Sequence, residues 1–368
     1  MKQVLLSQAY LKMGNQLLKL PGMVDVHVHL REPGGMQKED FETGTMAAIA
    51  GGYTQILDMP NNIPPTVDLM SLEDKISRAK GRIWCDLGFN FGATAESVKY
   101  FKQVYKKAFG LKVYMNQTTG PLLVDKSEDR ELIFKSWISN IPIMVHAQDE
   151  TIEDAIRLAK KYRKKIHICH MTANQIRSIN KAKTSGINVT TEVCPHHLFL
   201  NKGDIQSLGP LGIMKPPLMS KADQHKLWDN LELIDMISTD HAPHTLEEKY
   251  DKRDPKFGVP GLETTLPLMF TAVTRKLIGI EKLVEKLATN PRKIFNLPKQ
   301  DKTFVIYDTT RRYKLSEKKL FTKCRWTPFK DLEGKGEVKE VVIRGETVFK
   351  DGKYVGRPSG RVMQQNAK

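Results

Sequence analysis

Two histidines in the apolar segment VDVHVHL, residues 24–30, have the type and spacing of metal ligands. Successive side chains of a β-strand point to opposite faces, so His27 and His29 share one face, where two imidazoles can bind one metal ion. An isolated His-x-His pair in a strand is more often incidental, so further ligand residues must recur downstream. If they do, the pattern favours metal-dependent hydrolysis.

Further polar residues do recur near the ends of later apolar runs. Taken singly, His146 and His170 read as hydrogen-bonded core histidines and Asp240 as a helix cap. Jointly these explanations are improbable, because the functional groups of a barrel of parallel strands gather at the C-terminal ends of its strands. The residues that follow this rule are His27, His29, Asn61, Lys112, His146, His170, Glu192 and Asp240.

Lys112 lies inside the apolar segment GLKVYM, residues 110–115, where a buried ammonium group is costly and cannot bind a cation. If its uncharged amine captures carbon dioxide, the resulting carbamate is a bidentate anion. Such a group can bridge two zinc ions held by the four histidines and Asp240. The alternative is a lysine whose side chain extends to the rim of the barrel.

The order of predicted elements would bring these residues to one end of a barrel. Eight short β-type runs alternate with helix-like stretches, an order typical of a parallel (β/α)8 or TIM barrel. The strands are predicted over residues 24–29, 53–59, 84–91, 111–115, 141–147, 165–170, 187–193 and 236–240. Helices are predicted over residues 41–50, 96–108, 131–139, 151–162, 173–183 and 221–231.

After the barrel, helices are predicted over residues 262–277 and 281–296, and a β-hairpin over 337–351 turns at Arg344 and Gly345. A tail of about 65 residues with few large apolar runs is marginal as an independent domain. We therefore expect a small, reduced β-rich subdomain that packs on the barrel. It would combine an N-terminal segment, residues 1–20, with a C-terminal extension, residues 299–368, around a barrel over residues 21–298.

Composition bounds the class of protein. The 368 residues are 40% hydrophobic and 27% charged, which suits a folded globule with a large core. No run of about 18 apolar residues occurs, and polar residues interrupt the leucines of the first 20, so neither a membrane span nor a signal peptide is predicted. The four cysteines are widely separated, which suggests reduced thiols, one or more of them a possible metal ligand, in a cytoplasmic protein.

The net charge of +16 invites a nucleic-acid interpretation. The lysines are nevertheless spread over predicted helix faces, without interleaved aromatics or a zinc-finger pattern, so we expect no nucleic-acid partner. A solvated lysine-rich surface explains the charge, as does attraction of an anionic small substrate or an acidic neighbouring protein.

Ordered motifs along nearly the whole chain carry a family resemblance. They are LPGMVDVHVHLREPGG, DMPNNIPPT, GLKVYMNQT, VHAQ, HICHMT, TEVCPHHLFL, STDHAPHTLEEK, GVPGLET, NPRKIFNLP, WTPFKDLEGKGEV and VVIRGETVFKDG. On these motifs the chain resembles dihydroorotase of the amidohydrolase superfamily. The similarity is greatest to the dihydroorotase domain of the animal-type multifunctional pyrimidine-synthesis enzyme.

The resemblance implies a binuclear zinc centre and the reversible closure of N-carbamoyl-L-aspartate to L-dihydroorotate and water. In ring opening the zinc pair activates water and polarises the ring amide, while Asp240 carries the proton to the leaving nitrogen. In ring closure Asp240 takes a proton from the ureido nitrogen. The implied ligands are His27, His29, carboxylated Lys112 and Asp240 for one zinc, and Lys112, His146 and His170 for the other.

The resemblance also implies a carboxylate-binding group made of Arg31, Asn61 and His244. Arg31 offers a planar donor fork that suits a carboxylate. The structural alternatives are a rim salt bridge for Arg31, a turn residue for Asn61 and a surface-loop histidine for His244. Backbone groups of Pro260 and Gly261 are expected to receive the ring amides, because glycine permits a close approach.

Cys169 and Glu192 match positions that resemble ligands of an additional zinc in the animal-type branch, where a histidine would be shared with the main pair. Thiolate and carboxylate are suitable ligands. An ideal strand would send the side chains of Cys169 and His170 to opposite faces, however, so a plain buried cysteine is the alternative.

A loop over residues 116–124 is expected to close over the substrate, with Thr118 as its contacting tip. The chain departs from the animal-type pattern at two places. Thr119 stands where that pattern has an aromatic residue, so the closed loop should seal less well. Lys215 stands where the animal-type pattern has arginine. Bacterial members tend to have lysine there, so this departure weakens the placement in the subgroup more than the function.

The resemblance further implies a homodimer that works beside aspartate transcarbamoylase and carbamoyl-phosphate synthetase, either as a domain of a larger polypeptide or as a free-standing relative. A hydantoinase or allantoinase is the nearest enzymatic rival, because these enzymes share the metal ligands. A non-catalytic homologue that only scaffolds a partner enzyme is the rival from another class. The residues Arg31, Asn61 and His244 speak against the first, and the complete ligand set speaks against the second.

Overall fold

The structure of the protein is a computed structural model that describes residues 11–13 and 16–365. The predicted N-terminal segment 1–20 is therefore described only in part, since residues 1–10 and 14–15 lie outside the described residues. Residues 366–368 lie outside them as well.

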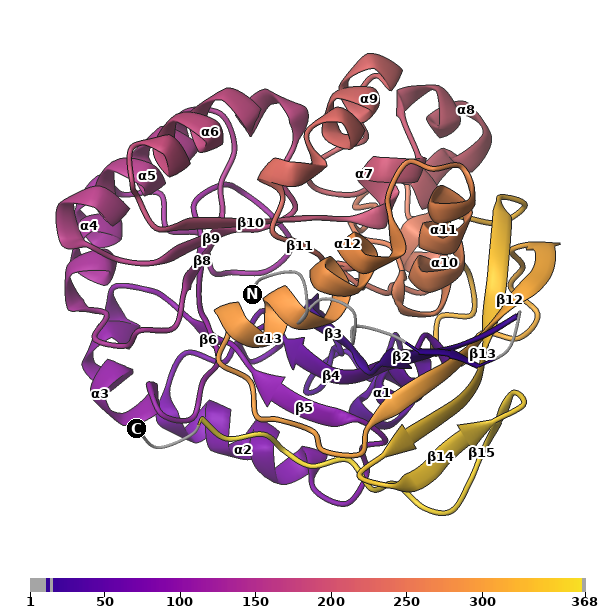
Figure 1. The fold of residues 1–368 in the computed structure, drawn as a ribbon. Helices are drawn as coiled ribbons and strands as arrows, with labels where there is room; N and C mark the ends of the chain where they lie inside the picture. Colours follow the sequence, from indigo (N-terminus) through magenta and orange to yellow (C-terminus); the bar gives the residue numbers. More distant parts are fainter. Residues whose placement is uncertain (1–10, 14–15, 366–368) are drawn as a thin grey trace, which may run out of the picture.

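Two parallel sheets form the centre of the molecule (Figure 1). Their strands are buried on both faces, which is why they read as nearly continuous apolar runs instead of alternating ones. One sheet has the order β3 (Met23–Val28), β4 (Tyr53–Asp58) and β5 (Asp86–Phe89). The other has the order β6 (Phe91–Gly92), β7 (Leu111–Tyr114), β8 (Ile143–His146), β9 (Ile166–Ile168), β10 (Val189–Val193) and β11 (Met236–Ile237).

The edges of the two parallel sheets meet at two places. Asn90 alone separates β5 from β6, and its amide donates to Asp58 O (2.9 Å). At the other edge, Val28 of β3 and His241 form an isolated parallel bridge, and the amide of His29 donates to His241 O (2.8 Å). The segment that follows β11 therefore lies beside the end of β3.

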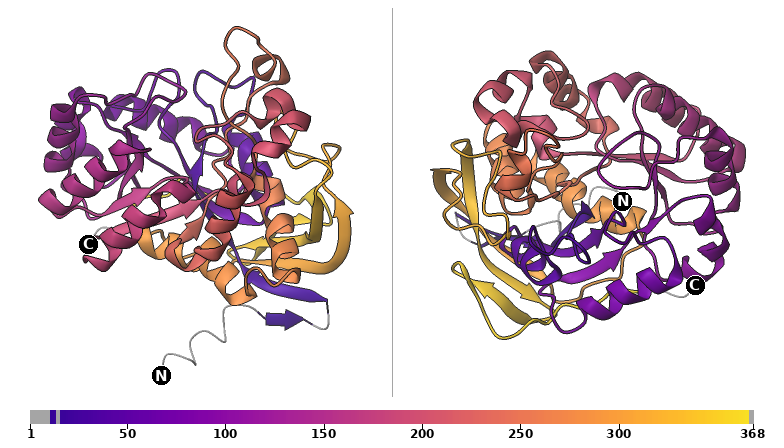
Figure 2. Two further views of the ribbon diagram at one scale, coloured as in Figure 1. Left: turned by 90° about the horizontal axis from the view of Figure 1, so that it is seen from above. Right: turned by 180° about the vertical axis from the view of Figure 1, so that it is seen from behind.

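Helices cover the outer side of these strands (Figures 1 and 2). In α5 the buried residues Ile152, Ala155, Ile156 and Ala159 recur with helical spacing, so one face packs on the sheet while the other carries charge. Helices follow the parallel strands from β3 to β10 along the chain. They include α1 (Phe41–Ala50), α2 (Leu69–Ala79), α3 (Phe101–Val104), α4 (Ser127–Ser136), α5 (Glu150–Tyr162), α6 (Ile176–Thr184), α7 (Pro195–Phe199), α8 (Ile205–Leu208) and α9 (Lys221–Asp229).

Several element boundaries differ from the prediction. The strand predicted over residues 236–240 ends at Ile237, and the helix predicted over 96–108 is a 3-10 turn (Glu96–Tyr100) followed by the short α3. The helix predicted over 281–296 is divided into α12 (Ile280–Val284), a π-helical turn (Glu285–Thr289) and α13 (Asn290–Ile294). Pro291 lacks an amide hydrogen, which accounts for the irregular helix just before it. The prediction did not include α2.

An antiparallel sheet contains segments from both ends of the chain and lies beside α11 (Leu262–Thr274) (Figure 2). The predicted hairpin is confirmed, because Ile343 pairs with Glu346 across the turn. Arg344 and Gly345 both have positive φ (53° and 88°), as a type I′ turn requires. The strand order is β1 (Leu11–Met13), β2 (Leu17–Pro21), β12 (Phe304–Lys314), β13 (Glu333–Ile343), β14 (Glu346–Lys350) and β15 (Lys353–Tyr354).

Polar contacts fasten this sheet to the parallel strands. Arg344 Nη1 lies 3.0 and 2.8 Å from the two carboxylate oxygens of Asp86 on β5. Asp86 also accepts from Gln300 Nε2 (2.7 Å) and from the amide of Arg361 (2.8 Å), so one buried carboxylate joins three segments of the tail. Among the described residues, no helix is long and apolar enough to cross a lipid bilayer.

Candidate active site

His27 and His29 face Asp240, as the strand pattern predicts. Asp240 Oδ1 lies 3.3 Å from His27 Nε2 and 3.1 Å from His29 Nε2. Asp240 does not end a strand as predicted, because β11 ends three residues earlier. It has a positive φ of 47°, a conformation that a non-glycine residue adopts at a cost. The parallel bridge between Val28 and His241 brings the two segments together.

Lys112, His146 and His170 lie in the same buried region. Lys112 is completely buried on β7 and its Nζ lies 3.0 Å from Cys169 Sγ. His146, at the end of β8, has its Nδ1 2.7 Å from His170 Nε2. The other ring nitrogen of each, His146 Nε2 and His170 Nδ1, has no hydrogen-bond partner among the described residues, although both are buried. Buried unpaired nitrogens of this kind fit metal ligation.

The surroundings favour neutral imidazoles. Burial lowers the pKa of His29, His146 and His170 well below the usual value, and it also lowers the pKa of His27. A neutral imidazole keeps a lone pair, which is the form that binds a metal ion. The donor set therefore fits one or more divalent ions. His27, His170 and Asp240 bring ligand atoms within 4.8 Å of one another.

Cys169 joins the same cluster, contrary to the opposite-face geometry of an ideal strand. Strand β9 ends at Ile168, and His170 has a positive φ of 34°, so the alternation of side chains no longer applies at this point. Cys169 Sγ, a carboxylate oxygen of Glu192 and a nitrogen of His27 lie within 4.8 Å of one another. Glu192 also contacts His27 Nδ1 directly, and its Oε2 lies 3.1 Å from His167 Nε2.

Arg31, Asn61 and His244 lie next to this cluster. Asn61 Oδ1 is 2.7 Å from His29 Nδ1, and Arg31 Nη2 is 3.1 Å from His244 Nε2. Arg31 is buried, has a φ of 64° and donates through Nε to Pro243 O (3.0 Å). The structure thus brings the three predicted carboxylate-binding residues to one side of the imidazole cluster, and His244 is a buried residue, not a surface one.

The loop over residues 116–124 lies against this group. Thr119 O accepts from Asn61 Nδ2 (3.1 Å), and Gln117 O accepts from Lys215 Nζ (3.2 Å). Thr118, the predicted tip, is half-buried between these two contacts. Of the two departures from the animal-type pattern, Lys215 contacts the loop through its side chain, whereas residue 119 is held through its backbone carbonyl, which any residue supplies.

Pro260 and Gly261 are buried, but the backbone of Gly261 already has partners. Its amide donates to His241 Nδ1 (3.1 Å), and its carbonyl accepts from Thr265 Oγ1 (2.8 Å). Of the expected backbone groups for the ring amides, this leaves the carbonyl of Pro260. Glycine at residue 261 instead permits a close approach to Thr239, because a Cβ there would lie 3.1 Å from Thr239 Cβ.

Sequence reasoning missed residues that hold the site together. Asp25 accepts from the amides of His27 (3.0 Å) and Thr239 (3.1 Å), and burial raises its pKa to about 7. Asp58 and Lys75 form a buried ion pair (2.5 Å) behind the loop that carries Asn61. Both acids lie inside apolar strands, so the signal that singled out Lys112 could have found them.

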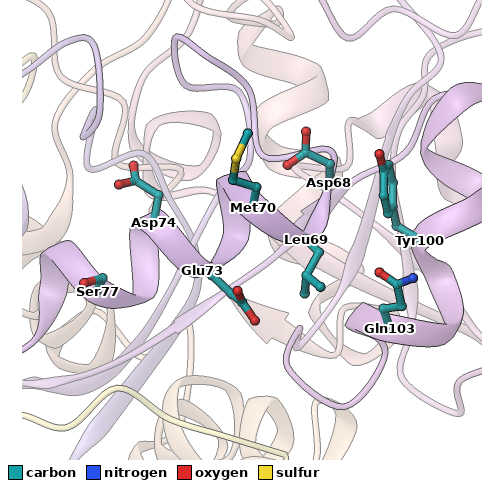
Figure 3. A pocket seen from close by; sticks show the side chains of 8 residues that line it. All are labelled: Asp68, Leu69, Met70, Glu73, Asp74, Ser77, Tyr100 and Gln103. Carbon is teal, nitrogen blue, oxygen red and sulfur yellow. The ribbon is translucent and has the colours of Figure 1, made fainter.

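Two other features lie outside the predicted site. Cys194, His196 and His197 follow one another in the CPHH motif and bring buried ligand atoms within 4.8 Å. A surface hollow of about 570 Å³ lies between α2 and α3 (Figure 3). Its carboxylates already have partners: Asp68 caps α2, and Glu73 and Asp74 pair with lysine and arginine side chains. It contains none of the predicted site residues.

Comparison with known proteins defines the class. Residues 18–208 match the model of the amidohydrolase family, which is more than half of the chain. The chain therefore belongs to the amidohydrolase family.

Individual relatives define the branch. The chain is 43% identical over 348 residues to the multifunctional protein CAD of Squalus acanthias, covering 94% of this chain and 15% of that protein. It is 35% identical over 364 residues to the dihydroorotase of Pyrococcus furiosus, covering 95% of this chain and 86% of that enzyme. These relatives place it among the dihydroorotases. The chain spans only about a seventh of the multifunctional relative.

Solved structures share the fold. The L-hydantoinase of Arthrobacter aurescens superposes with a TM-score of 0.89 at 24% identity, covering 94% of this chain and 89% of that one. The inactive dihydroorotase-like domain of a Chaetomium thermophilum CAD-like multifunctional protein superposes with a TM-score of 0.81 at 25% identity, covering 95% and 99% of the two chains. At these identities we take the likeness as evidence of a common α/β architecture.

Proposed function

We propose that this chain is a zinc-dependent dihydroorotase that interconverts N-carbamoyl-L-aspartate with L-dihydroorotate and water, a step of de novo pyrimidine synthesis. The observation that carries the proposal is one buried cluster in a member of the dihydroorotase branch. It combines an imidazole group, a buried amine, an acid and a carboxylate-binding side. The first three suit hydrolysis of a cyclic amide, and the last suits an anionic ring.

The residues fit a pair of zinc ions. Within the described part of the chain, His146 Nε2 and His170 Nδ1 have no hydrogen-bond partner, and burial lowers the pKa of both rings and favours their neutral form. Lys112 cannot ligate a cation as an ammonium, so we assign it as the carbamate that bridges the pair. When bound, zinc would lower the pKa of water and polarise the ring carbonyl. The assigned ligands are His27, His29, Lys112 and Asp240 for one ion, and Lys112, His146 and His170 for the other.

Asp240 is the proton carrier in this proposal. Its carboxylate lies within 3.3 Å of both His27 and His29 and keeps a small exposed fraction. In ring opening it takes a proton from the attacking water and delivers it to the ring nitrogen that leaves. In ring closure it takes a proton from the ureido nitrogen that attacks the carboxyl carbon.

Arg31, Asn61 and His244 hold the substrate carboxylate. The guanidinium of Arg31 is fixed by Pro243 O and His244, which orients its remaining donors. Thr118 in the loop contacts the substrate when the loop closes, and the carbonyl of Pro260, with the backbone of Gly261 behind it, accepts from a ring N–H.

A third zinc ion at Cys169 and Glu192, with His27 shared, belongs to the proposal because these three groups converge. The competing role for Glu192 is orientation of the His27 ring through Nδ1, since a carboxylate behind a metal-binding histidine fixes its tautomer. Zinc counts on a Cys169→Ser variant separate the two roles.

The two parallel sheets are best described together as a (β/α)8 barrel. The short gap at Asn90 lets β5 and β6 count as one strand, and the bridge between Val28 and His241 joins the first strand to the segment that follows the last. We assign the barrel to residues 21–298. The antiparallel sheet, which contains described residues of segments 1–20 and 299–368, is then a reduced form of an amidohydrolase β-subdomain.

The assembly is inferred from the relatives alone. From the family resemblance we infer a cytoplasmic homodimer that works with aspartate transcarbamoylase and carbamoyl-phosphate synthetase. The match to one segment of a multifunctional protein supports only the association with other enzymes. The small-molecule substrate is the partner for which the site itself gives support.

The same experiment can test two rival functions. The L-hydantoinase likeness favours a cyclic amidohydrolase of other specificity, such as a hydantoinase or allantoinase. The inactive dihydroorotase-like domain favours a scaffold. The buried pairing of Arg31 with His244 argues for a carboxylate-bearing substrate, and the assembled ligand cluster argues for catalysis.

The decisive experiment measures zinc per chain and the hydrolysis of L-dihydroorotate, hydantoin and allantoin. We expect dihydroorotate to be preferred and Lys112→Ala and Asp240→Ala each to lower its hydrolysis by at least about 100-fold. Lys135→Ala, at an exposed position on α4, is the control and should change nothing. Undiminished activity in both site variants rejects the mechanism, and preference for a ring without the carboxylate rejects the substrate. Bound zinc without turnover on any ring supports the scaffold.

A further inference from the structure

His244 is held from the side opposite Arg31 by an acid that sequence reasoning did not single out. Glu248 Oε2 lies 3.0 Å from His244 Nδ1, while Arg31 Nη2 and Phe257 O lie 3.1 and 3.0 Å from Nε2. The side chain of His244 is fully buried, and these contacts are made inside the protein. One ring nitrogen therefore faces a carboxylate, and the other faces the carboxylate-binding guanidinium.

Glu248 is itself fixed. Its Oε1 pairs with Lys38 Nζ at 2.8 Å, and Lys38 Nζ also lies 3.4 Å from His244 Nδ1. Glu248 lies in the short helix α10 (Leu246–Lys249), whose N-cap Thr245 accepts from the Glu248 amide (3.3 Å). Both side chains are mostly shielded, with exposed fractions of 24% for Glu248 and 15% for Lys38. The ion pair with Lys38 and the position at the start of helix α10 together restrict the orientation of the Glu248 carboxylate.

The charges agree with this geometry. Burial opposes ionisation of Glu248, but its hydrogen bonds with His244 and Lys38 outweigh burial and lower its pKa to about 2. An ionised carboxylate accepts and cannot donate, so the proton between it and His244 resides on Nδ1. Nε2 without a proton accepts from Arg31, whereas Phe257 O, a carbonyl 3.0 Å from the same nitrogen, has a donor there only when Nε2 is protonated.

We propose that Glu248, anchored by Lys38, is a positioning residue that sets the ring orientation and the Nδ1 proton of His244 and thereby selects substrates that carry a carboxylate. The inference rests on the proposed dihydroorotase function and deepens it. Glu248 does not touch the substrate: it acts through His244. A carboxylate that fixes the distal nitrogen of a functional histidine is a known second layer of such sites.

The test compares Glu248→Gln with Glu247→Gln in the zinc-loaded enzyme. Glu247 is the matched control because it is the preceding glutamate in the same helical turn and its side chain is exposed. Steady-state kinetics with L-dihydroorotate give kcat and KM, and competition gives the inhibition constant of orotate, a ring with the same carboxylate. We expect Glu248→Gln to raise KM and the orotate constant together by about 10-fold, with kcat changed less than about 3-fold. Glu247→Gln should leave all three unchanged.

Lys38→Met is the second variant and keeps the proposal testable should Glu248→Gln fold poorly. It should raise the same two constants by a smaller factor, about 3-fold, because Glu248 remains but is less fixed. Equal constants for Glu248→Gln and Glu247→Gln overturn the proposal, as does a fall in kcat at constant KM. Wild-type protein that does not turn over dihydroorotate contradicts the proposed function itself. Wild-type turnover with an unchanged KM in both variants contradicts only the role of Glu248.

Discussion

At the scale of single residues, the chain buries an unusual number of polar groups, and most of them have assigned partners. Asp58 and Lys75 form an ion pair, and Glu248 forms one with Lys38. Asp25 accepts hydrogen bonds from two backbone amides. Since an unpaired buried charge or donor is costly, each pairing makes a local constraint that holds the neighbouring site residue in place. The buried nitrogens of His146 and His170 are exceptions, and they lie where the zinc pair is proposed.

His197 gives a prediction about acid stability. It is buried and its Nε2 donates to Pro216 O (3.1 Å), and burial lowers its pKa to about 4 from 6.5. The unfolded chain therefore binds a proton at higher pH than the folded chain. Stability that is present above pH 6.5 is lost as the pH falls through about 4.

We expect His197→Gln, which keeps a donor near the Nε2 position, to reduce this loss by about 1–3 kcal/mol between pH 7 and pH 4.5. Urea unfolding at the two pH values measures it as the difference between the pH effects in wild type and variant. His225→Gln, at an exposed position on α9, is the control. An equal acid loss in wild type and His197→Gln would show that His197 is not responsible.

At the scale of elements, the ends of strands matter more than their middles. Strands β9 and β11 stop before the residues that were expected to end them, and His170 and Asp240 follow with positive φ. This backbone conformation aims both side chains at the cluster, although strand alternation alone would not do so. Such costly conformations persist only where the surrounding structure supports them.

The loop over residues 116–124 gives the prediction at this scale. Lys215 Nζ donates to Gln117 O and lies 4.4 Å from the centre of the Phe257 ring, so it fastens the loop to the side that carries His244. We expect Lys215→Met to raise the KM for dihydroorotate about 3-fold and to speed proteolytic cleavage within the loop, while the melting temperature stays within about 2 °C.

Limited proteolysis with mass spectrometry locates the cleavage, and Lys221→Met, an exposed lysine at the start of α9, serves as the comparison. Cleavage at the same rate in Lys215→Met and wild type would mean that the lysine does not hold the loop.

At the scale of the whole molecule, polar contacts connect the C-terminal tail, residues 299–365, to the parallel sheets. Asp86 on β5 receives Arg344, Gln300 and the amide of Arg361 from the C-terminal part. The stacked rings of Phe270 and Tyr307 (4.3 Å) add an apolar contact between α11 and β12. A tail fastened in this way should unfold together with the parallel sheets.

We expect Asp86→Asn to lower the free energy of unfolding by about 1–3 kcal/mol, because it leaves the partly buried guanidinium of Arg344 without its counter-charge. Urea unfolding followed by tryptophan fluorescence and circular dichroism should still show one transition. Asp74→Asn, in an exposed pair with Arg78, should cost less than about 0.5 kcal/mol. Two separate transitions in wild-type protein would contradict cooperative unfolding of the tail with the parallel sheets.

The sequence by itself determined the alternation of strands and helices, the hairpin turn at Arg344 and Gly345, and the identity of the candidate ligands. These features are local, since periodicity, turn residues and ligand types are properties of short segments. It also indicated the family, because the motifs occur in order.

Only the tertiary structure decided which residues meet. Cys169 lies beside His27 because strand β9 ends early. The amide of Gly261 donates to His241, and the position of Glu248 at the start of a helix places its carboxylate beside His244. Each of these contacts depends on backbone conformation or on segments far apart in the chain. The spacing of residues along one element does not encode these backbone conformations or these long-range contacts. Spacing could therefore identify the candidate ligands but not their partners.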